Sequence, residues 1–377
     1  MRNRPDHYAE RKVRLCTLDP KGEMHIVIGC PDSVDTLKTF IEPEGCFSPG
    51  VASFGVYFWV FDDTTRMFYA PTLNTPPPQR GLSEEGYLIP WSEWEAGCCR
   101  IRSEYSQTKM AQNEYLGVRI DCTASCPRSI RLYIAIRPMG PAGWPIHNLE
   151  ILDRQIVMID GKPVLTCTPQ ADAAGALAED RIGEFAMLGT VPPAQSAQSA
   201  GTCSGALVYN LNIIPENPAK IELLAPILPG RRAAPHDWDD HSWFRQDRAD
   251  LSPENRKGVK QPIPSISECR SLSFARLRAQ SHSEWRQFCG SSRLQAPDIH
   301  WRQASNAIPA HIGMCFNDGE LDLAVMTINR FTRDAVFMVH CLQMKGCFEW
   351  SRKAIARILE KPFSGRVKPE ADNPGQV

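Results

Sequence analysis

Apolar and polar residues alternate along most of the first two-thirds of the chain, as they do in β-strands with one buried face. In segment 130–137 the two expected faces are Leu132, Ile134 and Ile136 against Arg131, Tyr133, Ala135 and Arg137. Similar runs predict strands at 24–29, 51–61, 66–70, 99–105, 115–122, 149–152, 206–214 and 220–225. Asp160-Gly161 between two apolar runs predicts a tight hairpin. So many strands, joined by Pro- and Gly-rich turns, predict a large two-sheet β-sandwich.

The final third follows a helical period instead. Phe274, Leu277 and Trp285 predict an amphipathic linker helix that begins near Ser271 and ends near Gly290. Pro297-Asp298 is a helix start signal. The apolar positions expected on the helix that follows are Trp301, Ala304, Ile308 and Ile312.

Segment 329–359 predicts two further helices joined by a tight turn. Thr332 is the expected N-cap of the first helix, Asp334 lies in its first turn, and Lys345-Gly346 ends it. Its expected buried positions are Ala335, Val336, Val339, Leu342 and Gln343. The second helix has a predicted apolar stripe at Phe348, Ser351, Ile355, Ile358 and Leu359. The pair is a predicted αα-hairpin.

Two segments lack either period. Segment 192–201 is poor in apolar residues and is predicted to be a mobile loop. Segment 229–264 is polar and studded with proline, as expected of a tether between domains. The expected organisation is therefore a β-sandwich domain at 1–228, a linker at 229–270 and a helical domain at 271–377.

Composition and charge narrow the possible partners. The chain has 377 residues, of which 42% are hydrophobic and 23% charged, as in a globular protein. Forty-two basic residues oppose 43 acidic ones, giving a net charge of -1, so no global field recruits nucleic acid or an anionic membrane. The first residues carry charge but no apolar signal region. We therefore expect a cytoplasmic protein with neither a nucleic acid nor a membrane partner.

The cysteines and histidines predict neither a metal nor a cofactor. The 14 cysteines are scattered without a paired CxxC arrangement, so the expected state is reduced, mostly buried thiols. Segment 236–241 holds two histidines and three aspartates, which are possible metal ligands. Their spacing matches no helix-borne ligand motif, and a loop fixed by aspartate–backbone hydrogen bonds is the favoured interpretation.

Arg333 and Asp334 are the candidate binding residues. Residue physics alone favours a solvated helix end, where Asp334 complements the helix dipole. However, Arg333-Asp334-Ala335, followed by Gly346 and Glu349, resembles the first hairpin of glucoamylase-like glycoside hydrolases. The predicted order of a sandwich, a Trp-bearing linker helix and a Pro-Asp helix entry is similar to the same family.

The resemblance implies a mainly β then α chain, with an N-terminal β-supersandwich, a linker helix and the first hairpins of an (α/α)6 toroid. It also implies that the Arg333-Asp334 pair holds sugar hydroxyls, which suits a guanidinium fork beside a carboxylate. Asp372 resembles a residue on the loop that enters the next helix of the family. Carbohydrate is therefore the expected partner.

A catalytic pair is not expected in this chain. Glycoside hydrolysis ordinarily takes two carboxyl groups, and the resemblance places them on later hairpins. Only 81 residues remain from Pro297 to the end, which is room for about three or four helices, so the chain is expected to be the N-terminal portion of such a protein. None of the nearby acidic residues has the spacing of a catalytic group: Asp318, Glu320, Asp322, Glu370 and Asp372.

Four interpretations follow. The favoured one is a glycoside-hydrolase-like protein that binds an oligosaccharide or glycoside, with hydrolysis expected only alongside a missing C-terminal part. The second is a non-catalytic carbohydrate-binding module with Tyr57, Phe58 and Trp59 as a stacking platform. The third is a structural or assembly domain of unassigned oligomeric state. The fourth is a truncated product whose unfinished helical layer exposes apolar stripes.

Overall fold

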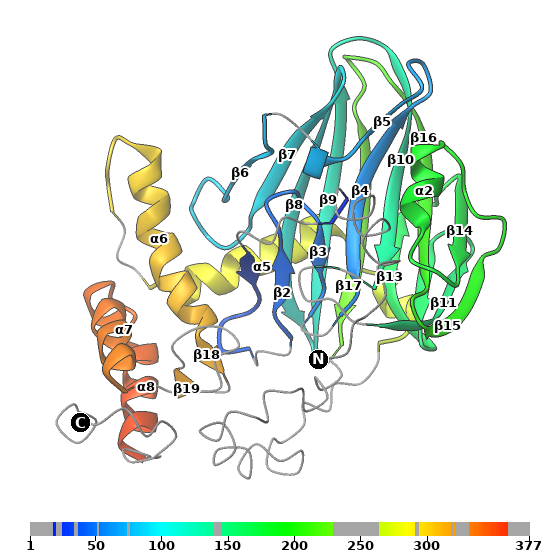
Figure 1. Cartoon of the computed structure of the whole chain (residues 1–377). Helices are drawn as coiled ribbons and strands as arrows, with labels where there is room; N and C mark the ends of the chain where they lie inside the picture. The colour runs from blue at the N-terminus through cyan, green and yellow to red at the C-terminus, as the bar shows by residue number, and fades with distance from the viewer. Residues whose placement is uncertain are drawn as a thin grey trace, which may run out of the picture.

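Two antiparallel sheets followed by helices make up the structure, which is a computed structural model (Figure 1). It describes residues 18–19, 25–33, 37–50, 53–73, 76–138, 140, 145–228, 264–290, 294–317, 320–321 and 332–360. All strands up to β17 precede the helical region, with one short helix, α2, among them. The chain is therefore mainly β and then α, as predicted.

The eight-stranded sheet has the order β1-β2-β3-β4-β10-β16-β14, with β5 paired to β4. Its strands are β1 Ile26–Ile28, β2 Thr39–Ile41, β3 Phe47–Ser48, β4 Gly55–Asp62, β5 Met67–Tyr69, β10 Arg128–Arg137, β14 Ala173–Leu177 and β16 Ser204–Ile213. Strand β10 lies at its centre, between β4 and β16. The predicted alternation in β10 is confirmed, because Leu132, Ile134 and Ile136 belong to one buried cluster and Tyr133 and Ala135 to another.

The nine-stranded sheet has the order β15-β11-β12-β13-β17-β9-β8-β7-β6. Its strands are β6 Gln79–Gly81, β7 Trp91–Ala96, β8 Cys99–Met110, β9 Asn113–Ala124, β11 Ile146–Leu152, β12 Ile156–Ile159, β13 Lys162–Thr168, β15 Ser196–Gly201 and β17 Ala219–Ile227. Asp160 and Gly161 join β12 to β13 with φ of 50° and 75°. Two consecutive positive φ angles suit a tight hairpin, so that prediction is confirmed.

The prediction of a mobile loop at 192–201 is wrong. Residues Ser196–Gly201 form the edge strand β15, which pairs with β11. Side chains of β15 alternate between exposed and half-buried positions, with Gly201 alone fully buried, and the strand is held by backbone hydrogen bonds to its neighbour. Such a strand needs no apolar alternation, so sequence composition could not reveal it.

The main hydrophobic core joins the two sheets. It includes Val56, Phe58 and Ile134 from the eight-stranded sheet, and Ile101 and Leu116 from the nine-stranded one. A second cluster lies on the opposite face of the eight-stranded sheet, where Tyr57, Trp59 and Phe61 of β4 pack with residues of helix α2 (Ile182–Met187). Strand β4 is therefore buried on both faces.

Helices cover the nine-stranded sheet and extend beyond it (Figure 1). They are α4 Ile266–Arg270, α5 Phe274–Phe288, α6 Ile299–Met314, α7 Thr332–Met344 and α8 Phe348–Glu360. Helix α5 packs on β8, β9 and β17, with Phe274, Leu277 and Trp285 buried as predicted. Gly290 follows it with φ of 68°. Helix α4, which falls inside the predicted linker, was not expected.

Helix α6 has the predicted start but not the predicted buried face. The Asp298 carboxylate accepts a hydrogen bond from the His300 backbone N–H at 2.7 Å, so Asp298 is the N-cap. Trp301 and Ile308 are 67% and 53% exposed, whereas Ala307 and Ala310 are buried. A helix with apolar residues on several sides does not reveal which side faces its neighbour.

Lys38 connects the sandwich to the helical region. Its ammonium group donates to the carbonyl oxygens of Met314 at 2.6 Å and Phe316 at 3.0 Å, and the side chain is fully buried. The Met314 carbonyl lies at the C-terminal end of α6, where the helix dipole favours a cation. Phe316 begins the short hairpin of β18 (Phe316–Asn317) and β19 (Glu320–Leu321).

Candidate active-site hairpin

Helix α7 carries the two predicted sugar-binding residues in its first turn. Thr332 is the first residue of the helix, whereas an N-cap at Thr332 would make Arg333 the first helical residue. Arg333 is exposed and Asp334 is half-buried. A carboxylate in the first turn complements the partial positive charge of the helix N-terminus. Arg333 and Asp334 therefore lie in the first turn of a helix, as predicted.

The turn between α7 and α8 is set by Gly346. Its φ is 79°, which favours glycine. The Gly346 N–H donates to the Gln343 carbonyl at 2.9 Å, and the Cys347 N–H donates to the Leu342 carbonyl at 2.8 Å. This hydrogen-bond pair is a Schellman motif, which satisfies carbonyl groups that the helix end would leave unpaired. The sequence prediction of a helix end at Lys345-Gly346 is confirmed.

The buried faces of the hairpin differ in part from the predicted stripes. Ala335, Val339 and Leu342 of α7 are buried as expected. On α8 the buried residues are Ser351, Ala354 and Ile358. Four residues of the predicted stripes are instead exposed, with these exposed fractions: Val336 41%, Phe348 68%, Ile355 36% and Leu359 58%. Helix α8 therefore buries two small side chains, Ser351 and Ala354, while several of its larger ones are exposed.

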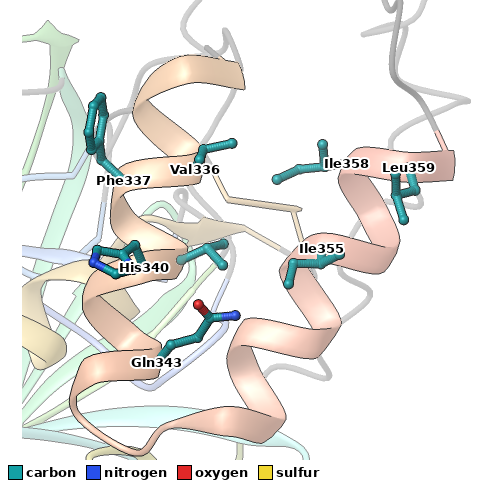
Figure 2. Close-up of a pocket in the computed structure, with 8 residues that line it drawn as sticks. Val336, Phe337, His340, Gln343, Ile355, Ile358 and Leu359 are labelled. Atoms are coloured by element: carbon teal, nitrogen blue, oxygen red, sulfur yellow. The ribbon is translucent and has the colours of Figure 1, made fainter. Parts of the chain in front are cut away.

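A groove of about 420 Å³ lies between the two helices. Its lining residues are Val336, Phe337, Val339, His340 and Gln343 from α7, with Ile355, Ile358 and Leu359 from α8. In Figure 2, Val336 and Gln343 extend from α7 toward α8, where Ile358 and Ile355 face them. Phe337 and His340 project from the other side of α7. Polar groups in the groove are few, so a ligand there would make mostly apolar contacts.

Helix geometry relates Arg333 to this groove. Residues three, four and seven positions apart lie along one side of a helix, and these positions after Arg333 are Val336, Phe337 and His340. Of these, Phe337 and His340 lie on the side of α7 turned away from α8, so Arg333 begins that side and lies at the edge of the groove. Sequence reasoning missed Phe337, His340 and Gln343 as groove residues, although the spacing from Arg333 could have identified the first two.

The other acidic candidates do not form a site in the described part of the chain. Glu320 begins strand β19. Asp318, Asp322, Glu370 and the predicted sugar-binding residue Asp372 lie outside the described residues. Of these five candidates, the structure therefore describes Glu320 alone.

The predicted stacking platform is wrong. Tyr57, Phe58 and Trp59 are 2%, 1% and 1% exposed. Phe58 belongs to the core between the sheets, and Tyr57 and Trp59 pack beneath α2. A sugar cannot reach these rings, because helix α2 and both sheets cover them.

The part of the chain that the structure describes contains neither a metal-ligand cluster nor a membrane-spanning helix. No group of three or more His, Cys, Asp or Glu residues there could hold a metal ion. The predicted loop at 236–241 lies outside the described residues. Among the described helices, none combines the length and apolar character needed to span a bilayer.

No protein-family profile matches the sequence, and no curated protein matches it. The structure is similar, at 10% identity and a TM-score of 0.47, to a bacterial glucoamylase in complex with acarbose; the match covers 77% of this chain and 40% of that one. A protein assigned as a kojibiose phosphorylase from the human microbiome matches at 11% identity and a TM-score of 0.36, over 70% of this chain and 30% of that one. The chain thus spans less than half the length of either protein. A TPR-domain protein from Parabacteroides distasonis matches with a TM-score of 0.27.

Proposed function

We propose that this chain is a carbohydrate-binding part of a glycoside-hydrolase-like protein, and that Arg333 and Asp334 hold sugar hydroxyls. The observation that carries the proposal is their position: both lie in the first turn of α7, Arg333 is exposed, and Phe337 and His340, four and seven positions after it, line the edge of a groove. The chain order of sandwich, linker helix and helical hairpin agrees with the resemblance found in the sequence.

The chemistry of this helix start suits a hydroxyl-rich ligand. A guanidinium donates two parallel hydrogen bonds, and a carboxylate accepts hydrogen bonds from hydroxyl groups. Backbone N–H groups in the first turn of a helix have no partner within the helix and add further donors. Phe337, which is 69% exposed, offers a ring face one turn away. A sugar ring has both hydroxyls and an apolar C–H face, so it could use both kinds of contact.

Hydrolysis is proposed only for a longer protein that supplies two carboxyl groups. Asp372 remains a proposed third sugar-binding residue on the basis of the sequence resemblance. No acid or base is assigned. In this proposal the role of the present chain is to position the sugar.

Thermal unfolding of residues 1–377 against a panel of glucosides and disaccharides tests the proposal. A ligand at one hundred times its dissociation constant adds about 2.7 kcal/mol to the unfolding free energy, which raises the melting temperature by several degrees. Arg333→Ala and Asp334→Asn should each abolish most of that rise. Arg276→Ala is the matched control, because Arg276 is an exposed arginine in the first turn of α5.

The outcomes separate the remaining interpretations. A sugar-dependent rise that Arg333→Ala removes and Arg276→Ala retains supports binding at α7. A rise in melting temperature that Arg333→Ala and Arg276→Ala both retain would place sugar binding elsewhere in the chain. A cooperative transition that no sugar shifts would overturn the proposal in favour of a structural β-sandwich protein.

A further inference from the structure

Two half-buried cysteines meet where the chain crosses from one sheet to the other. Cys98 lies in the turn between β7 and β8 of the nine-stranded sheet. Cys126 lies in the connection that leaves β9 of the same sheet and enters β10 of the eight-stranded sheet. The Ser125 N–H donates to the Cys98 carbonyl at 3.0 Å, which extends the β8–β9 pairing and fixes the two segments beside each other.

The sulfur atoms are in direct contact. The Cys126 thiol donates to Cys98 Sγ, with 2.8 Å between the sulfurs. A disulfide has a sulfur separation of about 2.05 Å, so a small approach of the two side chains would allow the covalent bond. Cys99 is a poorer partner, because consecutive Cα atoms are about 3.8 Å apart, below the usual range for disulfides. It is also buried, at 2% exposure.

The groups around the pair give the two thiols different pKa values. Arg128 Nε donates to Cys98 Sγ at 3.0 Å, and the Asp62 carboxylate lies 3.7 Å from the same nitrogen. Burial opposes ionisation of Cys98, but the hydrogen bonds from Cys126 and Arg128 outweigh it and lower the pKa of Cys98. Donation to Cys98 raises the pKa of Cys126. Burial, followed by the charge of Cys98, raises the pKa of Cys99 to about 12.

We infer that Cys98 and Cys126 form a reversible redox site, in which Cys98 attacks a peroxide and Cys126 then closes a disulfide. The inference rests on the sulfur contact, on Arg128 beside Cys98 and on the partial exposure of both thiols. Other described cysteines with raised pKa values, such as Cys122 and Cys167, are buried within the sandwich. The site is independent of the α7–α8 hairpin.

The chemistry balances with peroxide as the oxidant. The Cys98 thiolate attacks one peroxide oxygen, which breaks the O–O bond, gives Cys98 sulfenic acid and releases hydroxide. The hydroxide takes up the proton that Cys98 had lost. The Cys126 sulfur then attacks the sulfenic sulfur, its proton leaves with the hydroxyl group as water, and the S–S bond forms. The two thiols lose two electrons in total, and the peroxide oxygens gain them. A dithiol reductant reverses the reaction by thiol–disulfide exchange.

The disulfide would link Cys98 to Cys126, so the cross-linked loop would contain the whole β8–β9 hairpin. It would join the β7–β8 turn of one sheet to the start of β10 in the other. A cross-link of this loop length restricts the unfolded chain. We therefore expect the oxidised protein to unfold at a temperature several degrees higher than the reduced protein.

The test treats the full chain with hydrogen peroxide, then blocks free thiols and maps peptides by mass spectrometry. The expected product is a peptide pair joined through Cys98 and Cys126, lost on treatment with dithiothreitol. In the reduced protein, iodoacetamide should alkylate Cys98 several-fold faster than Cys341, a half-buried cysteine whose pKa is raised by burial. Arg128→Met should remove most of that difference in rate.

Variants make the result decisive. Cys126→Ser should leave Cys98 as a sulfenic or more oxidised acid without a cross-link, and Cys341→Ser should still form the disulfide. If peroxide oxidises Cys98 no faster than Cys341, or if the folded wild-type protein gives no Cys98–Cys126 cross-link, the inference is wrong. A cross-link between Cys98 and Cys99 instead would also overturn it.

Discussion

The β-sandwich and the helical region keep their large apolar side chains in different places. In the sandwich, β4 is buried along its whole length, and the exposed large apolar residues among the described positions are few and scattered: Met67, Leu73, Met187, Leu188 and Ile214. The described helical region is much shorter and exposes more of them: Leu294, Trp301, Ile308, Val336, Phe337, Met344, Phe348, Ile355 and Leu359. The sandwich buries its apolar surface within itself, whereas the helices bury only part of theirs.

This difference has a physical origin. Two sheets and α2 enclose the aromatic residues of β4 from both sides, so each face of β4 has a partner. A helical hairpin has apolar residues on more than one side. Helices α7 and α8 pack on each other, α7 also meets α6, and α8 meets β19 and Phe288 of α5, which leaves their other sides exposed. Groups of exposed apolar side chains commonly mark binding surfaces. The groove between α7 and α8 belongs to this exposed surface.

The largest expected effect comes from Arg137 in the sandwich. Its guanidinium is 2% exposed, forms two hydrogen bonds of 2.9 Å with Asp180 and contacts Asp19 at 2.7 Å. Arg137→Met leaves two carboxylates without their cation, which should cost about 3–5 kcal/mol of unfolding free energy. Urea unfolding measures the loss, with exposed Arg276→Ala as the control. A loss below about 1 kcal/mol would mean that water replaces the guanidinium.

Two phenylalanines test the comparison directly. Phe58 is 1% exposed in the sandwich core, and Phe337 is 69% exposed on α7. Phe58→Ala should cost about 3–5 kcal/mol through the cavity it leaves. Phe337→Ala should change the unfolding free energy by less than about 0.5 kcal/mol. Equal losses in the two variants, measured by urea unfolding, would show that Phe337 is covered in solution.

Lys38 tests whether the two regions unfold together. Lys38→Met removes two charge-assisted hydrogen bonds to the carbonyls of Met314 and Phe316, and the loss should be about 2–3 kcal/mol. We expect the sandwich and the helices then to unfold in two steps, visible as separate transitions in tryptophan fluorescence and far-UV circular dichroism. A single unshifted transition would contradict a coupling role for Lys38.

The smallest effect concerns pH and Glu284 of α5. Burial raises the pKa of Glu284, although Thr108 and Gln280 donate to its carboxylate at 2.8 Å and 3.1 Å. A carboxyl whose folded pKa is raised stabilises the fold when protonated, and that contribution is lost as pH rises through the folded pKa. Glu284→Gln should therefore melt about 1–3 °C higher than the wild type at pH 8 and no higher at pH 4.

The control for this pH effect is Glu360→Gln at an exposed position of α8. Its melting temperature relative to the wild type should vary little between pH 4 and pH 8. A Glu284→Gln advantage that grew toward low pH would reverse the expected sign and refute the assignment.

Local sequence patterns were enough to predict several elements of both regions. Alternation in β10 gave the correct two faces, because a half-buried strand must place every second side chain in the core. Asp160-Gly161 and Gly346 predicted their turns, since both places need positive φ. Asp298 and the Arg333-Asp334 pair marked helix starts, because helix termini need specific partners for their backbone groups.

Long-range packing decided what the sequence alone could not. Edge strand β15 depends on pairing with β11, a partner more than forty residues earlier in the chain. The exposed faces of α6, α7 and α8 depend on which neighbours cover them, and the periodicity of a helix with several apolar sides fits more than one arrangement. Cys98 and Cys126 became a pair only because β8 and β9 bring their turns together. The sequence determines local conformation and the alternation of faces, whereas contacts between distant segments exist only in the folded chain.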